Sequence, residues 1–238
     1  MKKQTKLQLK HTKIGKFKIQ FENEPEFHGL KREIFGQDCY FFESNSAQPI
    51  ILDIGAHIGL STLYFKSLHP GAKITCLEPV PSSFELLERN VFENRLDDVT
   101  CLQLALSQST NPLTLHIDPE KSNWYSSASV RPGAWNGQQP TQIIEVKTST
   151  LDKLITYPID LLKLDIEGAE QTILENNQQL FPKIKQLLIE FHPGGNQSLD
   201  KICSLLEKSG YKLEYRKNGQ TVPKQRAKGL VVIHASKN

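Results

Sequence analysis

From Pro49 onward, short apolar runs alternate with segments of helical spacing, and this alternation constrains the fold more than any other feature. Residues Ile50–Ile54 form a nearly continuous apolar run that ends in a glycine turn, which is typical of a strand buried on both faces. A helix is predicted from about Leu60 to Leu68, because Pro70 and Gly71 follow it. Repeated strand–helix units predict an α/β fold, a parallel sheet with helices on both faces.

The same pattern predicts the remaining elements. Strands are expected at residues 73–78, 99–106, 160–165, 186–191, 211–216 and 230–235, and helices at residues 84–94, from the fourth strand to about 180, and at 198–208. Ser82 and Glu85 have the spacing of a capping box that opens one helix, and Gly210 closes another. Because only a polar turn separates the last two strands, the last strand is predicted to run antiparallel.

The first 45 residues differ from the rest of the chain. Phe17, Ile19 and Phe21 alternate with polar residues and predict a half-buried strand, and the run at residues 39–42 predicts a second one. Seven lysines between residues 2 and 18 belong to a solvated surface or steer an anionic substrate. We therefore expect an N-terminal extension with short strands at residues 1–45 and an α/β domain at residues 46–238.

The composition is that of an ordinary soluble protein, with 38% hydrophobic and 23% charged residues. The net charge of +3 gives no strong reason to expect a nucleic acid or an anionic membrane as partner. No stretch approaches the roughly 20 apolar residues of a membrane span, and the basic start lacks the apolar segment of a secretory signal. The four cysteines are scattered, which suits a reducing compartment. A soluble, cytoplasmic protein is expected.

A long segment at residues 118–140 has neither a helical nor a strand pattern and contains both tryptophans. Loops of this length in a compact domain are usually functional or disordered. Trp124 and Trp135 are consistent with a lid over a binding site and equally with simple packing.

In an open parallel sheet, ligands bind beyond the carboxyl ends of the strands, so the residues at those ends carry the functional prediction. The first strand ends in Asp53-x-Gly55-x-x-x-Gly59, and the second ends at Glu78. Glycine permits close approach of a ligand to the backbone. A carboxylate at the second strand end is placed to accept hydrogen bonds from both ribose hydroxyls of an adenosine. The competing interpretation is a glycine turn required only for packing.

The spacing of the two glycines separates the candidate ligands. A nicotinamide dinucleotide site needs G-x-G-x-x-G, in which a helix N-terminus receives pyrophosphate, whereas this turn has G-x-x-x-G with His57 and Ile58 inside it. No Walker sequence occurs either. The wider turn suits an adenosine ligand without pyrophosphate, such as S-adenosylmethionine. We interpret His57 as a capping or packing residue.

A second group of polar residues lies at the ends of the fourth and fifth strands. Asp165 and Glu167 follow the fourth strand, and Glu190 and His192 close the fifth, so these side chains are expected to face one crevice. A hydroxyl acceptor loses its proton as it attacks, which requires a base within hydrogen-bond reach. His192 is the first candidate because of its intrinsic pKa of about 6.5. Asp165 is the second, and Glu167 is expected to orient the substrate.

Each of these residues also has a plainer interpretation. Glu167 and Glu170 would complement the positive N-terminus of the following helix, and His192, which precedes a proline, would be a satisfied loop histidine. Asp165, Glu167, Glu190 and His192 are ligand types that a divalent metal takes, but their spacing imposes no metal geometry. No metal is predicted.

Several segments between residues 50 and 195 belong together: ILDIGAHIGLSTLYF, CLEPVPSSFELLERNV, STLDKL, DLLKLDIEGAEQTIL and LLIEFHP. The most specific part is Lys163-Leu164-Asp165-Ile166-Glu167-Gly168-Ala169-Glu170. In these segments the chain resembles the FkbM family of S-adenosylmethionine-dependent methyltransferases. The resemblance implies the class I methyltransferase fold, a Rossmann-like seven-stranded sheet with an antiparallel last strand. It makes residues 46–238 the methyltransferase domain.

The resemblance also implies S-adenosylmethionine as the cofactor and a role for each matching position. The residues that it assigns to the methionine part, the ribose and the adenine are, respectively, Asp53, Gly55 and Gly59 with Ala56 between them, then Glu78, then Ala105 to Ser107. The third strand end holds no acidic residue, so adenine contacts would come from the backbone. The implied reaction is O-methylation of a glycan or secondary metabolite, by in-line transfer with a general base.

The acceptor is expected to be a small molecule or a glycan that carries a hydroxyl, with no nucleic-acid partner; the oligomeric state stays open. A nucleic-acid methyltransferase is a competing hypothesis. Amino-methylating enzymes of that class usually carry Asp/Asn-Pro-Pro-Tyr/Phe where this chain has Asp165-Ile166-Glu167-Gly168, and two carboxylates there would repel phosphate. Two further hypotheses are a non-catalytic cofactor-binding module on the same fold and a nicotinamide oxidoreductase.

Overall fold

The computed structural model describes residues 8–117, 128–130 and 142–237. Residues 118–140, which include the candidate lid, therefore lie outside the described residues except for 128–130. The same holds for the first three lysines of the basic run.

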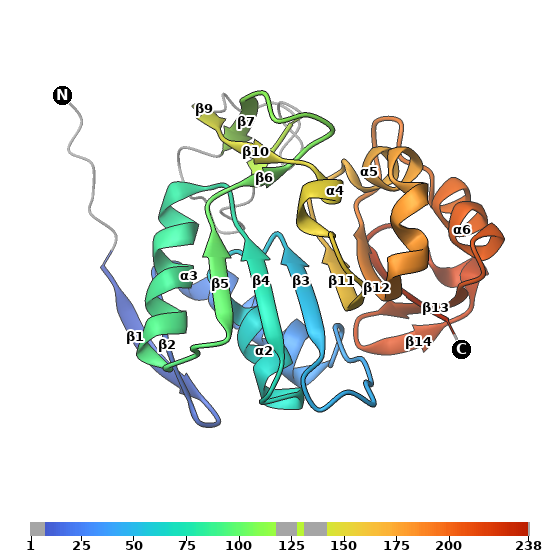
Figure 1. The fold of residues 1–238 in the computed structure, drawn as a ribbon. Helices are drawn as coiled ribbons and strands as arrows, with labels where there is room; N and C mark the ends of the chain where they lie inside the picture. Colours follow the sequence, from blue (N-terminus) through green and yellow to red (C-terminus); the bar gives the residue numbers. More distant parts are fainter. Residues whose placement is uncertain (1–7, 118–127, 131–141, 238) are drawn as a thin grey trace.

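The centre of the molecule is an eight-stranded sheet (Figure 1). In spatial order its strands are β14 (Gln220–Val222), β13 (Lys212–Lys217), β15 (Val231–Ser236), β12 (Ile184–Phe191), β11 (Ile159–Leu164), β3 (Ile50–Ile54), β4 (Lys73–Leu77) and β5 (Val99–Leu102). Neighbours from β12 to β5 are parallel, and β15 is antiparallel to both β12 and β13. The predicted class I methyltransferase sheet with its antiparallel last strand is confirmed. The additional strand β14 forms a hairpin with β13, in the segment predicted as a turn.

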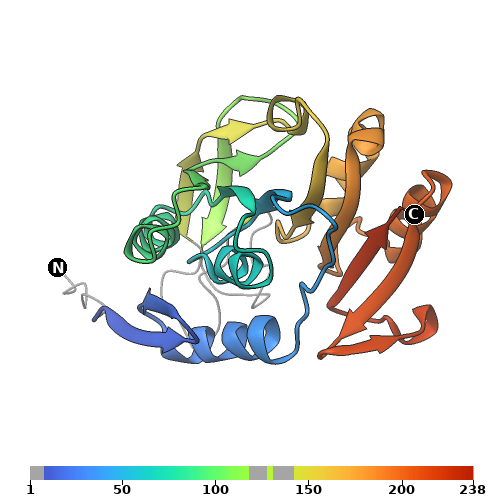
Figure 2. The same ribbon diagram turned by 60° about the horizontal axis from the view of Figure 1, so that its bottom comes forward.

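Helices cover both faces of the sheet, as Figures 1 and 2 show. The helices α2 (Leu60–Leu68) and α3 (Pro81–Glu93) lie on one face, and α4 (Leu151–Leu154), α5 (Glu170–Asn176) and α6 (Leu199–Lys208) lie on the other. Successive residues of β11 point to opposite sides. Leu161 packs in the core with α2 and α3, whereas Leu162 packs with α5 and α6. This two-sided burial explains why the central strands have uninterrupted apolar sequences.

Two small sheets lie beyond the carboxyl ends of the main strands (Figure 1). In one, β6 (Ala105–Leu106) pairs in parallel with β10 (Thr148–Ser149); in the other, β7 (Leu113–Ile117) pairs antiparallel with β8 (Ala128–Ser129) and β9 (Gln142–Val146). The strand predicted at residues 99–106 is therefore interrupted. Its first part stays in the main sheet as β5, and its second part leaves to pair with β10.

The N-terminal segment packs against the helices on one face of the sheet. It contains the hairpin β1 (Lys10–Ile14) and β2 (Phe17–Phe21), the helix α1 (Glu24–Lys31) and a π-helical turn η1 (Arg32–Gly36). The predicted burial of alternate residues in β2 is confirmed. These side chains share a hydrophobic core with α2, α3 and the sheet, and Figure 2 shows the blue segment alongside these helices. The segment therefore has no separate core.

The strand predicted at residues 39–42 is wrong, because these residues form a turn and a loop. Tyr40 and Phe42 are nevertheless buried, at 4% and 1% exposure. The apolar run correctly indicated burial. A strand also needs a neighbouring strand to take its backbone hydrogen bonds, and among the described residues no strand pairs with this run.

Some helix ends predicted from the sequence agree with the structure, and others differ from it. The predicted capping box of Ser82 and Glu85 is wrong: α3 begins at Pro81, and its N-cap Val80 provides no side-chain hydrogen bond. Proline is favoured at the first helical position because its missing N–H would have had no partner there. The helix predicted to end near residue 180 ends at Asn176, and a 3₁₀ helix, η2 (Gln178–Lys183), follows it. Gly210, with φ of 86°, follows the end of α6 as predicted.

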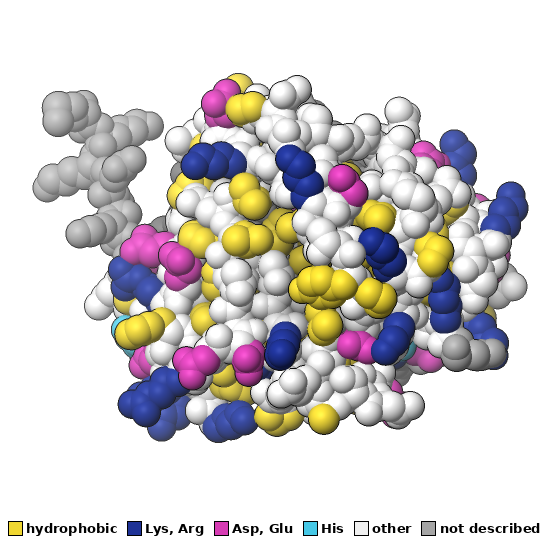
Figure 3. Space-filling model, in the orientation of Figure 1, with side chains coloured by type: hydrophobic (Ala, Val, Ile, Leu, Met, Phe, Trp, Pro, Cys, Tyr) yellow, Lys and Arg dark blue, Asp and Glu magenta, His cyan; other side chains and the backbone are white. Residues whose placement is uncertain are grey.

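No helix within the described ranges is long and apolar enough to cross a membrane. On the face of the molecule in Figure 3, basic and acidic side chains are interspersed. This face therefore presents no extended basic surface of the kind that binds a phosphate backbone.

Candidate active site

A cavity of about 450 Å³ lies beyond the carboxyl ends of β3, β4, β11 and β12, where open parallel sheets bind ligands. Among the residues singled out from the sequence, those that line it are Gly55, His57, Glu78, Ala105, Leu106, Asp165, Glu167, Glu190 and His192. Those that do not line it are Asp53, Ala56, Gly59 and Ser107. The cavity therefore brings together residues of the predicted cofactor site, such as Gly55 and Glu78, and residues at the ends of the fourth and fifth strands, such as Asp165 and His192.

The turn after β3 needs its glycines for close contacts within the protein. Gly55 has φ of 78°, and a Cβ atom there would lie 1.8 Å from the carbonyl oxygen of Asp165. Gly59 has φ of 91°, and a Cβ atom there would lie 2.8 Å from Leu87. Packing thus requires both glycines, and of the two Gly55 also lines the cavity.

Asp53 is fully buried beneath this turn. Its Oδ2 accepts hydrogen bonds from the hydroxyls of Ser61 and Thr62, at 2.7 and 2.8 Å, and its exposure is 0%. Its Oδ1 lies 3.4 Å from the Lys163 ammonium. The carboxylate therefore ties β3 to the first turn of α2 and to β11, and it does not reach the cavity wall.

Glu78 fastens the end of β4 to the two neighbouring turns. Its carboxylate accepts the backbone N–H of His57 at 2.9 Å and that of Val80 at 2.8 Å. Burial raises the pKa of Glu78, and the nearby His57 ring and the two N–H donors oppose that rise. His57 also lies 3.4 Å from Glu26 of α1. Each Glu78 oxygen keeps a lone pair for a further donor.

The end of β5 and the start of β6 form the wall next to Glu78. Ala105 and Leu106 line the cavity. The backbone N–H of Ala105 donates to Lys147, and that of Ser107 donates to Ser149, both at 2.9 Å. Because carbonyl groups in β10 and just before it already accept hydrogen bonds from these two N–H groups, Ala105 and Leu106 present mainly apolar surface to the cavity.

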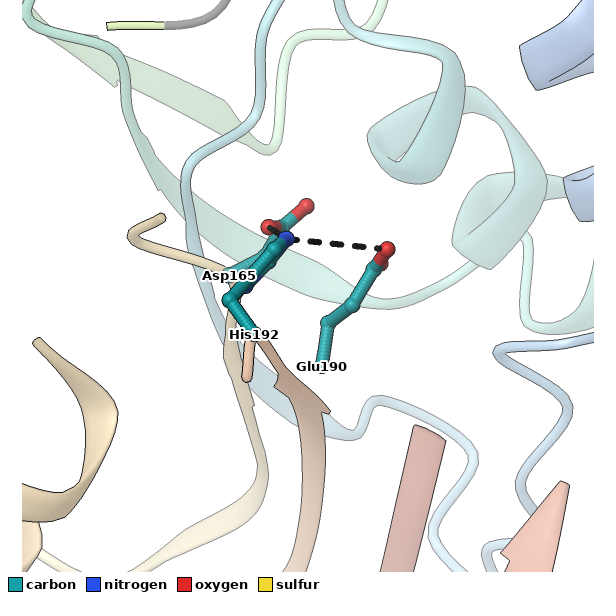
Figure 4. Close-up of side chains that lie close together, drawn as sticks. All are labelled: Asp165, Glu190 and His192. Atoms are coloured by element: carbon teal, nitrogen blue, oxygen red, sulfur yellow. Dashed lines mark ion pairs between the residues drawn. The ribbon is translucent and has the colours of Figure 1, made fainter. Parts of the chain in front are cut away.

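The second group of polar residues lies together at the ends of β11 and β12, and Figure 4 shows Asp165, Glu190 and His192 of this group. The Nδ1 of His192 lies 2.9 Å from Oε1 of Glu170, the first residue of α5. On the opposite side of the ring, Nε2 lies 3.5 Å from Glu167, 3.8 Å from Asp165 and 4.0 Å from Glu190. The expectation that the two strand ends face one crevice therefore matches this geometry.

The carboxylates shift the titration of His192. Burial alone lowers its pKa, but the hydrogen bond with Glu170 and the charges of Asp165, Glu167 and Glu190 outweigh it and raise the pKa to about 10. The imidazole therefore carries a proton at neutral pH. The intrinsic pKa that favoured His192 as the base does not apply in this environment.

The groups around Glu190 shift the pKa of its carboxyl group. Burial and the charge of Asp165 raise its pKa to about 8, against the effects of His192, Tyr40 and Lys163. The Tyr40 hydroxyl donates to Oε2 of Glu190 and lies 3.3 Å from Oδ2 of Asp165. The Tyr40 hydroxyl thus links the ends of β11 and β12.

Lys163 connects the cofactor turn to this cluster. Its ammonium donates to the carbonyl of Gly55 at 2.7 Å, lies 3.3 Å from Asp165 and sits 5.2 Å above the Tyr40 ring. Burial lowers its pKa, but the charges of Asp165, Asp53 and Glu190 outweigh that effect and raise it above the ordinary value. The lysine is therefore a buried cation between β3 and β11.

Sequence reasoning missed the N-terminal wall of the cavity. Glu26 and Leu30 of α1, Glu33 and Ile34 of η1, and the following Cys39 and Tyr40 all line it. Their spacing carries no motif, and the run at residues 39–42 resembled a strand. Only the packing of this segment against α2 brings it to the carboxyl ends of the strands.

Comparisons with known sequences agree with this geometry. A sequence profile for the methyltransferase FkbM domain matches residues 53–213. Methyltransferase sdnD of Sordaria araneosa is 30% identical over 232 residues, which cover 85% of this chain and 86% of that protein. The 31-O-demethyl-FK506 methyltransferase FkbM of Streptomyces tacrolimicus is 26% identical and is matched over 79% of this chain and 83% of its own length.

A solved structure shares the fold. The crystal structure of a methyltransferase FkbM from Methylobacillus flagellatus has a TM-score of 0.55 and 17% identity to this chain. The match covers 84% of this chain and 47% of the other, so this chain spans about half of that protein's length. The chain belongs to the FkbM family of S-adenosylmethionine-dependent methyltransferases.

Proposed function

We propose that this protein transfers the methyl group of S-adenosylmethionine to a hydroxyl oxygen of a small molecule or glycan. The observation that carries the proposal is the cavity, which Gly55 and Glu78 line together with Asp165, Glu167 and His192. The name of the Streptomyces relative states methylation at an oxygen. That relative supports O-methylation here, and the carboxylates at the acceptor side suit removal of a hydroxyl proton.

The cavity suits the charge of this cofactor. Its walls carry the carboxylates of Glu26, Glu33, Glu78, Asp165, Glu167 and Glu190. S-adenosylmethionine has a positively charged sulfonium and an ammonium group, so an acidic pocket attracts it. We assign Glu78 to the ribose hydroxyls, through its remaining lone pairs, and Gly55, which lines the cavity, to the methionine part. Asp53, Ala56 and Gly59 do not line the cavity, so we assign them to holding this turn in place.

We assign Asp165, Glu167 and His192 to binding and deprotonating the acceptor. S-adenosylmethionine, when bound, would supply an electrophilic methyl group for transfer to the acceptor oxygen. The residues of the cavity would hold the acceptor in position for that transfer, from which much of the rate would come. The hydroxyl proton passes to the carboxylate pair of Asp165 and Glu167, while the His192 Nε2 face orients the oxygen. Asp165 adjoins Gly55 directly, which supports a role for it next to the bound cofactor.

The apolar side chains that line the cavity indicate the class of acceptor. Leu30, Leu113, Leu115, Val130 and Leu230 line the cavity, so the acceptor has an apolar part. The surrounding carboxylates repel phosphate groups. A hydroxylated, uncharged molecule therefore fits the cavity better than a nucleic acid or a phosphorylated sugar does.

The cofactor assignment is tested by isothermal titration of S-adenosylmethionine. We expect Glu78→Ala to weaken binding at least tenfold, which corresponds to about 1.4 kcal/mol, because the ribose loses its acceptor. The control is Glu85→Ala, which removes an exposed carboxylate that pairs with Arg89 on α3. Equal affinity of Glu78→Ala and Glu85→Ala would overturn the assignment.

The reaction is tested with labelled cofactor and a panel of apolar hydroxylated compounds, sugar phosphates and RNA. Asp165→Asn combined with Glu167→Gln is expected to lower kcat by about 100-fold or more, the usual contribution of a general base. Cofactor affinity should change less than threefold. Transfer to RNA alone, or an undiminished kcat in the double variant, would contradict the proposal.

A further inference from the structure

Three ligand-type side chains converge at the ends of β11 and β12, as Figure 4 shows. One oxygen each from Asp165 and Glu190 and one ring nitrogen of His192 lie within 4.8 Å of one another. The Nε2 distances to these oxygens, 3.8 and 4.0 Å, exceed hydrogen-bond length. They are only slightly longer than the roughly 3–3.6 Å between ligand atoms that share an ion at about 2.1 Å. A small inward movement of the side chains would close the gap.

The His192 ring is oriented by a carboxylate outside this set. Its Nδ1 is held at 2.9 Å by Glu170, which is fully buried. The same Glu170 oxygen also accepts the backbone N–H groups of Ile166 and Gly168, so its position is fixed by the chain. A histidine that binds a metal through one nitrogen usually donates its other N–H to such a carboxylate. Here Nε2 is the nitrogen left facing the oxygens, and a bound cation would replace the proton that Nε2 carries without metal.

The three side chains are sheltered but reachable. Asp165, Glu190 and His192 are 22%, 16% and 15% exposed, and all three line the cavity. Glu167 adds a third carboxylate within 3.5 Å of Nε2. A compact divalent cation would offset the repulsion among these carboxylates, and it would lie next to the position expected for the acceptor oxygen.

We propose that Asp165, Glu190 and His192 bind one divalent cation of the Mg²⁺ or Mn²⁺ type. Two carboxylates and one imidazole, with open positions toward the cavity, form a donor set that Mn²⁺ accepts readily and Mg²⁺ accepts with bound water. Its role rests on the proposed function. The ion binds the acceptor oxygen and weakens its O–H bond, the proton passes to Glu167, and the oxygen forms the bond to the methyl carbon as the sulfur takes back its electron pair.

Binding is measured on the full chain after treatment with a chelator and removal of the chelator. Isothermal titration with MnCl₂ and the electron paramagnetic resonance signal of free Mn²⁺ should show one saturable site per chain. Glu190→Gln and His192→Gln are each expected to weaken Mn²⁺ binding at least tenfold. The matched control is Glu33→Gln, a carboxylate of the same cavity outside the set, which should change affinity less than threefold.

The outcomes of these experiments distinguish failure of the cation site from failure of the proposed methyltransferase reaction. Loss of binding in Glu190→Gln with an unchanged thermal midpoint supports the site. Absence of saturable Mn²⁺ binding at millimolar concentration overturns it, as does equal weakening by Glu33→Gln, which would indicate general attraction to an acidic pocket. If methyl transfer continues at full rate with chelator present, the site fails while the methyltransferase stands. If Mn²⁺ binds at this site but S-adenosylmethionine does not, the proposed function fails instead.

Discussion

Lys163 shows how one residue links the two halves of the active site. It faces Asp53 at the same register on the neighbouring strand, and both side chains are almost fully buried. Removing one member of such a pair leaves an uncompensated charge in the interior, whereas replacing both leaves neutral groups. The pair therefore contributes more to the position of the turn than to net stability.

We predict that Lys163→Met lowers the free energy of unfolding by about 3–5 kcal/mol. The double variant Asp53→Asn/Lys163→Met should recover most of this loss, because asparagine keeps an oxygen for the hydroxyls of Ser61 and Thr62. Urea denaturation followed by circular dichroism measures both.

The control for this prediction is Lys185→Met. Lys185 pairs with Asp160 at 2.7 Å on the adjacent strands, but its side chain is 67% exposed. Exposed pairs contribute about 1 kcal/mol or less, so this variant should be nearly as stable as the wild type. A double variant as unstable as Lys163→Met alone would contradict the account of the buried pair.

At the scale of elements, the turn between β3 and α2 is set by its neighbours on both sides. The N–H groups of Gly55 and Ala56 both donate to the carbonyl of Leu77 on β4. The Gly55 backbone also lies against that of Asp165, the residue after β11. Three strand ends are thereby held together, and a side chain at position 55 has no room.

We predict that Gly55→Ala destabilises the fold by about 2–5 kcal/mol, since the left-handed backbone costs about 1–2 kcal/mol and overpacking adds about 1–3 kcal/mol. Gly210→Ala is the matched control: Gly210 also has positive φ, at 86°, but a Cβ atom there has nothing within 4 Å. It should cost only the backbone part. Thermal unfolding of the two variants measures the difference, and equal losses would show that the contact with Asp165 is unimportant.

At the scale of the whole molecule, the antiparallel edge of the sheet introduces a pH dependence of stability. His234 of β15 accepts from Arg216 at 3.1 Å through Nδ1 and donates to Gln186 at 3.0 Å through Nε2. Burial and the Arg216 charge lower the pKa of His234 to about 4, and Glu214 opposes them only in part. In the unfolded chain the pKa returns to about 6.5, so the unfolded state binds the extra proton first.

His234 is therefore predicted to lower the free energy of unfolding as the pH decreases from about 6.5 to 4, by up to about 1.4 kcal/mol per pH unit. Glu190, whose pKa is raised to about 8, contributes with the opposite sign, so the prediction concerns the difference in slope between variants. His234→Asn keeps an acceptor for Arg216 and should remove the His234 contribution from the slope. His11→Asn, on the exposed side of β1, serves as the control for loss of a histidine. Urea titrations at pH 7, 6 and 5 give the slopes, and identical slopes in the wild type and His234→Asn would refute the prediction.

The pattern of the sequence was enough to predict the class of fold, because a strand buried on both faces must be apolar throughout and a crossover must follow it. Residues 50–54, 60–68 and 73–77 lie where that rule puts them. The polar residues at the strand ends were equally predictable. Parallel strands end at one edge of the sheet, so Asp165, Glu167, Glu190 and His192 had to lie near one another.

Only the tertiary structure decided which of these side chains reach the cavity and in what electrostatic state. Asp53 is turned inward by two hydroxyls of α2, and His192 holds its proton because Glu170 of α5 and the carboxylates at two strand ends surround it. Likewise, only the tertiary structure brings Tyr40 and the rest of the N-terminal segment to the wall of the cavity. Burial, charge and pKa depend on distances between residues far apart in the chain, whereas strand and helix patterns depend on neighbours within a few positions. For that reason the sequence by itself determined the sheet, its ligand-binding edge and the family, and the packing of distant segments determined the chemistry at that edge.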